Sequence, residues 1–194
     1  MPHHALLAKL CQLLQDEDLS ELERVRSRGC PDCGGPLYRA DYGRKPRGIE
    51  DAFEHYFASR LSLCCGREGC RRRRTPRSVR FLGRRVYFGA LVVLLCALRG
   101  GLLSWRLAFL QRAFDVSRRT LERWRAWWLG EFADGAFWRV SAGRFADGAG
   151  GRFALPRSLW LAWREQGFVS GCLSLLRFLS PLSSASITLA EVFI

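Results

Sequence analysis

The sequence has few acidic residues and almost no lysine. Its 194 residues contain 18 aspartates and glutamates against 31 lysines and arginines, and only Lys9 and Lys45 are lysines. Because 48% of the residues are apolar and 12% are aromatic, the chain can build a core and is not a disordered basic tail. The formal charge of +13 therefore belongs to a folded protein, and it favours a polyanionic partner, nucleic acid before an anionic membrane.

The sequence also lacks a stretch that is convincing as a membrane span. The uncharged residues 86–98 number thirteen; as a helix they would extend about 20 Å, whereas the hydrocarbon core of a bilayer needs about 30 Å. This stretch predicts a buried core helix, so no membrane partner is expected. The N-terminus shows no basic region followed by an apolar one, so we expect a cytoplasmic protein whose cysteines stay reduced.

Reduced cysteines at short spacing are typical metal ligands. Cys30 and Cys33 are separated by two residues and followed by two glycines, which permit the positive φ of a metal-binding knuckle. About thirty residues later, Cys70 pairs with either Cys64 or Cys65, and Cys65 is favoured because a glycine follows it, as one follows Cys33. We predict a structural zinc ion bound by Cys30, Cys33, Cys65 and Cys70.

A catalytic zinc is not expected. It would keep an open coordination position and need a general base, for which only Glu54 and His55 are at hand. The segment Ile49–Phe57 more simply predicts an insert that packs its aromatic side chains. Around it, Leu37–Tyr42 and Arg60–Cys64 predict two strands of a zinc ribbon, and the chain is predicted not to be an enzyme.

Positive charge is concentrated after the second knuckle. Residues 60–85 contain ten arginines against one glutamate. Such a run predicts an arm that neutralises phosphates without reading sequence. The predicted phosphate contacts of this arm are Arg71, Arg72, Arg73, Arg74, Arg77, Arg84 and Arg85.

The next stretch has the pattern of two helices joined by a turn. Residues 102–114 are helical in pattern, and Ser117 is a favourable N-cap for a second helix. Leu121, Trp124 and Trp128 fall on one stripe, so the basic residues at the start of this helix would face away from the core. In a helix-turn-helix such residues reach the major groove. The predicted contacts are Ser117, Arg118, Arg119, Thr120 and Arg123.

The segment Val116–Trp124 resembles the turn and recognition helix of transposase and resolvase helix-turn-helix units. The four-cysteine ribbon resembles the zinc-binding N-terminal modules of bacterial insertion-element proteins, so the resemblance covers roughly residues 28–130. It departs at Asp115, where such turns commonly carry glycine. The resemblance implies binding of double-stranded DNA in the context of transposition, in the bacterial cytoplasm and at the nucleoid. Few acids follow residue 130, so no nuclease domain of this chain's own is expected.

The predicted fold is mainly α with a small β zinc ribbon. An amphipathic N-terminal segment, 1–27, is interpreted as one helix or two short helices broken near Asp18, with Ser20–Glu23 as a capping box. A protein-interaction module that binds a transposase or integrase is the alternative function, and no oligomeric state is predicted. The expected parts are 1–27 N-terminal helix, 28–82 ribbon and basic arm, 83–130 helix-turn-helix, 131–157 glycine-rich connector, and 158–194 apolar helices or tail.

Overall fold

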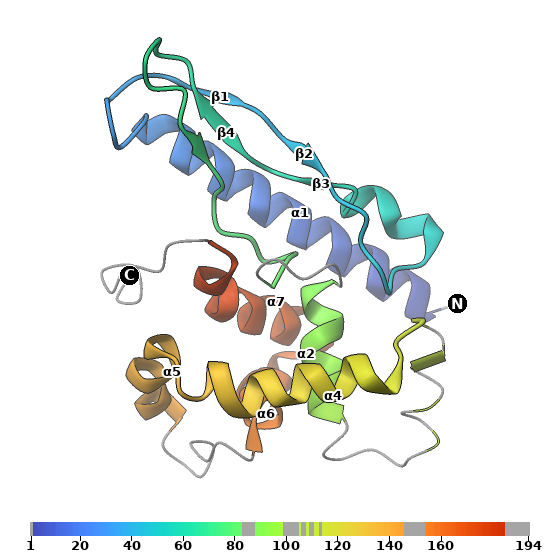
Figure 1. The fold of residues 1–194 in the computed structure, drawn as a ribbon. Helices are drawn as coiled ribbons and strands as arrows, with labels where there is room; N and C mark the ends of the chain where they lie inside the picture. The colour runs from blue at the N-terminus through green and yellow to red at the C-terminus, as the bar shows by residue number, and fades with distance from the viewer. Residues whose placement is uncertain are drawn as a thin grey trace.

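The computed structural model describes residues 2–82, 88–98, 105, 108, 111–112, 114–145 and 154–184. It is mainly helical, with a small antiparallel sheet beside the first helix (Figure 1). The predicted fold class is confirmed at this level. The elements are α1 Pro2–Arg28, β1 Leu37–Arg39, β2 Tyr42–Gly43, η1 Asp51–Tyr56, β3 Ser59–Arg60, β4 Leu63–Cys65, β5 Arg73–Arg74, α2 Gly89–Leu98, α4 Arg118–Trp127, a π-helical turn η2 Trp128–Phe132, α5 Ala136–Ser141, η3 Ala142–Phe145, α6 Arg157–Trp163, η5 Arg164–Gln166, α7 Phe168–Leu179 and η6 Ser180–Ser183.

The first helix, α1, is continuous from Pro2 to Arg28. Of the two interpretations of this segment, the single helix is confirmed and the break near Asp18 is wrong. The capping box is wrong too, because the Ser20 hydroxyl donates back to the Asp16 carbonyl oxygen at 2.9 Å, inside the helix. Helix α1 has 27 residues, which at 1.5 Å each gives about 40 Å. It ends where Gly29 takes a left-handed φ of 74° and donates its N–H to the Arg26 carbonyl oxygen.

Helix α1 packs into two separate apolar clusters. Its first half contributes Leu10 and Leu14 to the main core, which the later helices complete. Its second half contributes Leu22 to a smaller ribbon core under the strands. Figure 1 shows the strands and η1 along one side of α1, and helices α2, α4, α5, α6 and α7 along the other. One long helix thus joins the ribbon to the helical part.

The ribbon sheet has the strand order β1–β4–β5, with antiparallel neighbours. In this register Leu37 lies opposite Cys65, and Leu63 is on the same face; all three side chains are buried against the ribbon core. Residues 38, 64 and 73 lie on the opposite face. Strands β2 and β3 form a second antiparallel pair, and Phe53 and Phe57 of the insert between them are buried, as the sequence predicts.

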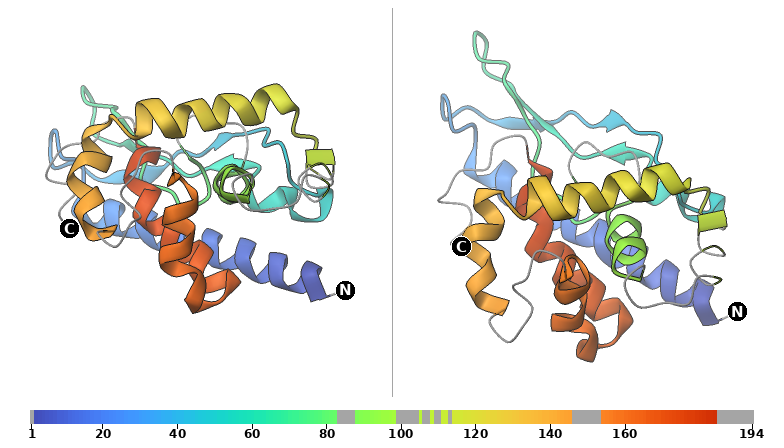
Figure 2. Two further views of the ribbon diagram at one scale, coloured as in Figure 1. Left: turned by 90° about the horizontal axis from the view of Figure 1, so that it is seen from below. Right: turned by 60° about the horizontal axis from the view of Figure 1, so that its bottom comes forward.

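Helix α2 lies at the centre of the main core, where Val92, Val93 and Cys96 are almost fully buried. This confirms the predicted core helix. Figure 2 shows α2 nearly end-on beneath α4, which crosses it, and α2 also contacts α6 and α7. No helix within the described residues is both long and apolar enough to cross a membrane.

The predicted glycine-rich connector is wrong for residues 131–145, because these contain the end of η2 and all of α5 and η3. Phe132, Phe137 and Trp138 are buried in the main core, and the Phe145 ring stacks on Trp138 at 5.6 Å between centroids. The aromatic residues between the glycines therefore decide the structure here. The predicted helix 102–114, Arg84, Arg85 and the last ten residues lie wholly or largely outside the described residues.

Candidate metal centre

The four predicted cysteines converge at one point of the ribbon. The Sγ atoms of Cys30 and Cys70 are 3.8 Å apart, those of Cys33 and Cys65 are 3.4 Å apart, and all four lie within 4.8 Å of one another. Four thiolates around a tetrahedral ion with bonds of about 2.3 Å would have their sulfurs about 3.8 Å apart. The cluster could therefore hold a metal ion without rearranging the backbone.

The end of α1 positions the first knuckle. Because Gly29 stops the helix, Cys30 is the first residue beyond the stop, and its N–H donates to the Gly35 carbonyl oxygen at 2.9 Å. The Gly34 N–H donates to the Cys30 carbonyl oxygen at 2.7 Å, and Gly34 has a φ of 69°. The turn between the first two cysteines is thus closed by backbone hydrogen bonds at both ends.

Gly35 is required by the closeness of two sulfurs. A Cβ atom at this position would lie 3.2 Å from the Sγ of Cys65 and 3.3 Å from the Sγ of Cys33. It would also lie 3.0 Å from the Cβ of Arg67. Any side chain here would push the two knuckles apart. Gly35 is therefore needed because there is no room for a side chain, and not because its backbone needs a positive φ.

Arg67 ties the second knuckle to the first. Its backbone N–H donates to the Sγ of Cys65 at 3.4 Å, and its guanidinium donates to the Cys33 carbonyl oxygen at 2.6 Å. Cys64 is not part of the cluster; its Sγ lies on the other face of the strand, 3.4 Å from the Arg71 carbonyl oxygen. The structure thus brings together Cys65, and not Cys64, with the other three cysteines.

The cluster gives its thiols different pKa values. The backbone N–H of Gly35 lowers the pKa of Cys33 to about 7, with further help from the neighbouring thiols. At Cys65 the N–H of Arg67 lowers the pKa, but desolvation and the other three cysteines outweigh it and raise the pKa to about 12. Four thiolates cannot coexist here without a cation, and a divalent ion would supply that charge.

Asp32, inside the first knuckle, binds the basic arm. Its two carboxylate oxygens accept from Arg72 at 3.0 Å and from Arg74, and a hydrogen bond from Arg74 together with the charges of both arginines lowers the pKa of Asp32. The sequence alone predicted no role for this aspartate, although its place between two predicted metal ligands was a signal. Arg72 and Arg74 are therefore held beside the cysteine cluster by the carboxylate of Asp32.

Two of the ten arginines in residues 60–85 are buried and cannot contact a phosphate directly. Arg60 and Arg80 are each 2% exposed. Arg80 Nε donates to Asp18 at 2.7 Å, and the same carboxylate accepts from the Ser78 hydroxyl at 2.6 Å and from the Val79 N–H at 2.7 Å. The arm is thus anchored to the middle of α1, and among its described residues the exposed arginines are Arg71, Arg72 and Arg73.

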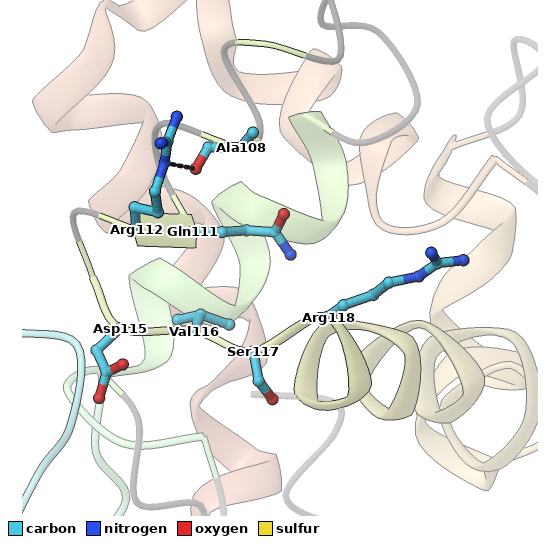
Figure 3. A pocket seen from close by; sticks show the side chains of 7 residues that line it. All are labelled: Ala108, Gln111, Arg112, Asp115, Val116, Ser117 and Arg118. Carbon is cyan, nitrogen blue, oxygen red and sulfur yellow. Dashed lines mark hydrogen bonds between the residues drawn. The ribbon is translucent and has the colours of Figure 1, made fainter.

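The predicted turn before α4 has a left-handed residue at Asp115, whose φ is 48°. Aspartate tolerates this conformation better than most residues other than glycine. Ser117 caps α4 as predicted, accepting from the Thr120 N–H at 3.2 Å. A pocket of about 470 Å³ lies at this turn, with Arg112 and Arg118 on different sides of it (Figure 3).

The predicted groove-contacting residues are exposed on α4, except for Thr120, which is half-buried. Arg118 has an 85% exposed side chain and pairs with Glu122 at 2.8 Å. Leu121 and Trp124 on the opposite side are buried in the main core. Helix α4 therefore presents a basic face over a fixed apolar one.

Comparison with known proteins found no similar protein. No family model matches the chain, and neither does any curated protein or solved structure.

Proposed function

We propose that this chain is a DNA-binding protein with a structural zinc ion, associated with a mobile element and without a nuclease domain of its own. The observation that carries the proposal is the basic face of α4, which begins directly after a capped left-handed turn and is fixed in place by buried apolar residues.

The position of the arginines on α4 supports a ligand at this face. Arg118 and Arg119 occupy the first turn of the helix, where positive charge opposes the helix dipole at a cost of about 0.3–1 kcal/mol each. Acidic residues in this first turn would stabilise α4, whereas the arginines do not. The N-terminal end of a recognition helix is the part that contacts base edges, and arginine paired with guanine is the commonest such contact.

The ribbon supports zinc as the ion. Four cysteine sulfurs with no other donor complete a tetrahedral site, which is the arrangement of structural zinc rather than catalytic zinc. The backbone closes both knuckles around the sulfurs, so the ion would fasten the end of α1 to β4 and to the basic arm. Metal analysis of the purified chain should give one zinc per chain, and iron in its place would contradict this part of the proposal.

DNA binding can be tested with the zinc-loaded chain and a pool of random duplexes. Replacing Arg118 and Arg119 with alanine should weaken binding by at least about 30-fold, because two lost contacts of about 1–3 kcal/mol each amount to at least about 2 kcal/mol when both reach a base. The wild-type affinity should fall steeply between low and moderate salt.

Arg139→Ala is the matched control, since Arg139 is an exposed arginine on α5. If the α4 variant loses no more affinity than this control, α4 is not the contact helix. An absence of duplex binding, together with capture of a transposase or integrase from nuclease-treated extract, would favour the interaction module instead.

A further inference from the structure

Two exposed tyrosines lie on successive strands of the ribbon. Tyr38 on β1 is 61% exposed and lies on the sheet face that points away from α1, and Tyr42 on β2 is 38% exposed. The sequence alone predicted no role for either residue. Their surroundings indicate the kind of ligand that fits them.

The ring of Tyr38 packs against Gly66 by one edge. A Cβ atom at Gly66 would lie 2.2 Å from Cε2, 2.7 Å from Cδ2 and 3.4 Å from Cζ of Tyr38, so the Cδ2–Cε2 edge of the ring meets the glycine and leaves no room for a side chain there. Contact along this edge restricts the ring, so a flat ligand can stack on it with a smaller loss of side-chain entropy.

Arg73 shares a sheet face with Tyr38. The register places Cys64 opposite both Tyr38 and Arg73, so these three residues are on one face of the sheet. The guanidinium of Arg73 lies over the Tyr42 ring, 5.6 Å from its centroid, and donates to the Ala40 carbonyl oxygen at 2.9 Å. A positive group thus accompanies the exposed rings, and sites that bind single strands combine aromatic rings with arginine in this way.

The rim of this face is basic. Residues 63–74 contain five arginines against one glutamate, and the loop 43–48 beside Tyr42 adds Arg44, Lys45 and Arg47 with no acid. Arg67, Arg71, Lys45 and Arg47 are exposed. An apolar protein partner would leave these charges without counter-ions, whereas a phosphate backbone would supply them.

We propose that this tyrosine face, formed by Tyr38, Tyr42 and Arg73, binds single-stranded DNA by stacking unpaired bases on the two rings. This function goes beyond duplex binding by α4 and does not need it; only the choice of DNA over RNA rests on the proposed function. The ribbon would then hold an unpaired stretch while α4 contacts a duplex. Sheet faces with exposed aromatic residues stack two or three bases in the same way.

The test compares a 12-nucleotide deoxythymidine oligomer with an abasic oligomer of the same length and charge. The zinc-loaded wild-type chain should bind the thymidine oligomer at least about 30-fold more tightly, because two stacked bases at about 1–3 kcal/mol each contribute at least about 2 kcal/mol. The variant Tyr38→Ala with Tyr42→Ala should bind both oligomers equally. The variant with phenylalanine at both positions should keep the preference within about threefold, since it keeps the rings.

Phe168→Ala, which removes an exposed ring from α7, is the matched control and should keep the full preference. A preference for bases that survives in the double alanine variant, or that is missing in the wild type, overturns the proposal. Tighter binding of a uridine ribo-oligomer overturns the choice of DNA. Duplex affinity is measured in parallel: its absence beside a tyrosine-dependent base preference would contradict the proposed function and leave this inference standing.

Discussion

Replacing Asp18 with alanine removes the counter-ion of a buried arginine. Arg80 is 2% exposed, and Asp18 accepts hydrogen bonds from its Nε and from the hydroxyl and N–H of the two preceding residues. The substitution leaves a charge and two donors buried without this acceptor. Breaking one partner of a buried pair costs about 3–5 kcal/mol, which is a large part of the stability of about 5–15 kcal/mol usual for a folded chain.

The expected result is a fall of the melting temperature by roughly 6–20 °C, since about 1 kcal/mol shifts it by about 2–4 °C in a chain of this length. The measurement is thermal and urea unfolding of the zinc-loaded chain, followed by circular dichroism. Glu17→Ala is the matched control on the same helix. Glu17 pairs with Arg177 at 2.5 Å, but both side chains are partly exposed, so its loss should cost only about 0–1 kcal/mol.

Equal destabilisation by the two alanine variants would refute the reasoning, because burial would then not distinguish the pairs. A double variant with Asp18→Leu and Arg80→Met removes both charges at once and should recover much of the loss, since an apolar pair leaves no unpaired charge. If this double variant is as unstable as Asp18→Ala, the loss comes from packing and not from the uncompensated guanidinium.

Three further predictions follow from the ribbon and the turn before α4. Cys65→Ser should abolish stoichiometric zinc binding, and Cys64→Ser should leave it intact, as measured by metal analysis after gel filtration; equal loss in both would contradict the ligand assignment. Gly35→Ala should weaken zinc affinity at least about tenfold in a chelator competition, because the added methyl group displaces two sulfurs, while Gly43→Ala, in open space, should not. Asp115→Gly should unfold at the same urea concentration as the wild type or a higher one, whereas Asp115→Val should be less stable by about 1–2 kcal/mol, because a β-branched residue disfavours its φ of 48°.

Local patterns in the sequence predicted the parts of this structure that depend on neighbours in the chain. Ser117 as a cap, Leu121 and Trp124 as a buried stripe, and the core helix around Cys96 each follow from spacing within a few residues. The choice of Cys65 over Cys64 rested on the glycine that follows it, and the alternation of a strand explains why only one of two adjacent cysteines can face the cluster.

Long-range pairs decided the features that the sequence did not predict. Asp18 looked like a helix breaker because its partner Arg80 is 62 residues away. Arg60 and Arg80 looked like surface charge because arginine in a run is usually solvated, and burial, which lowers the pKa of Arg60, depends on tertiary packing. The packing of the Tyr38 ring against Gly66 could not be predicted, because it depends on the pairing of strands distant in the sequence.

The continuity of α1 has a thermodynamic consequence. Its first half belongs to the main core and its last turn leads directly into Cys30, so the metal cluster and the helical core cannot unfold independently without breaking one helix. A ligand that binds only the folded chain stabilises it by RT ln(1 + [L]/Kd). If the ion is zinc, as proposed, each tenfold rise in free zinc above its dissociation constant would add about 1.4 kcal/mol to the stability of residues far from the sulfurs, including those that hold α4. The zinc concentration of the cell would then set how much of the ribbon and of the helical core is folded.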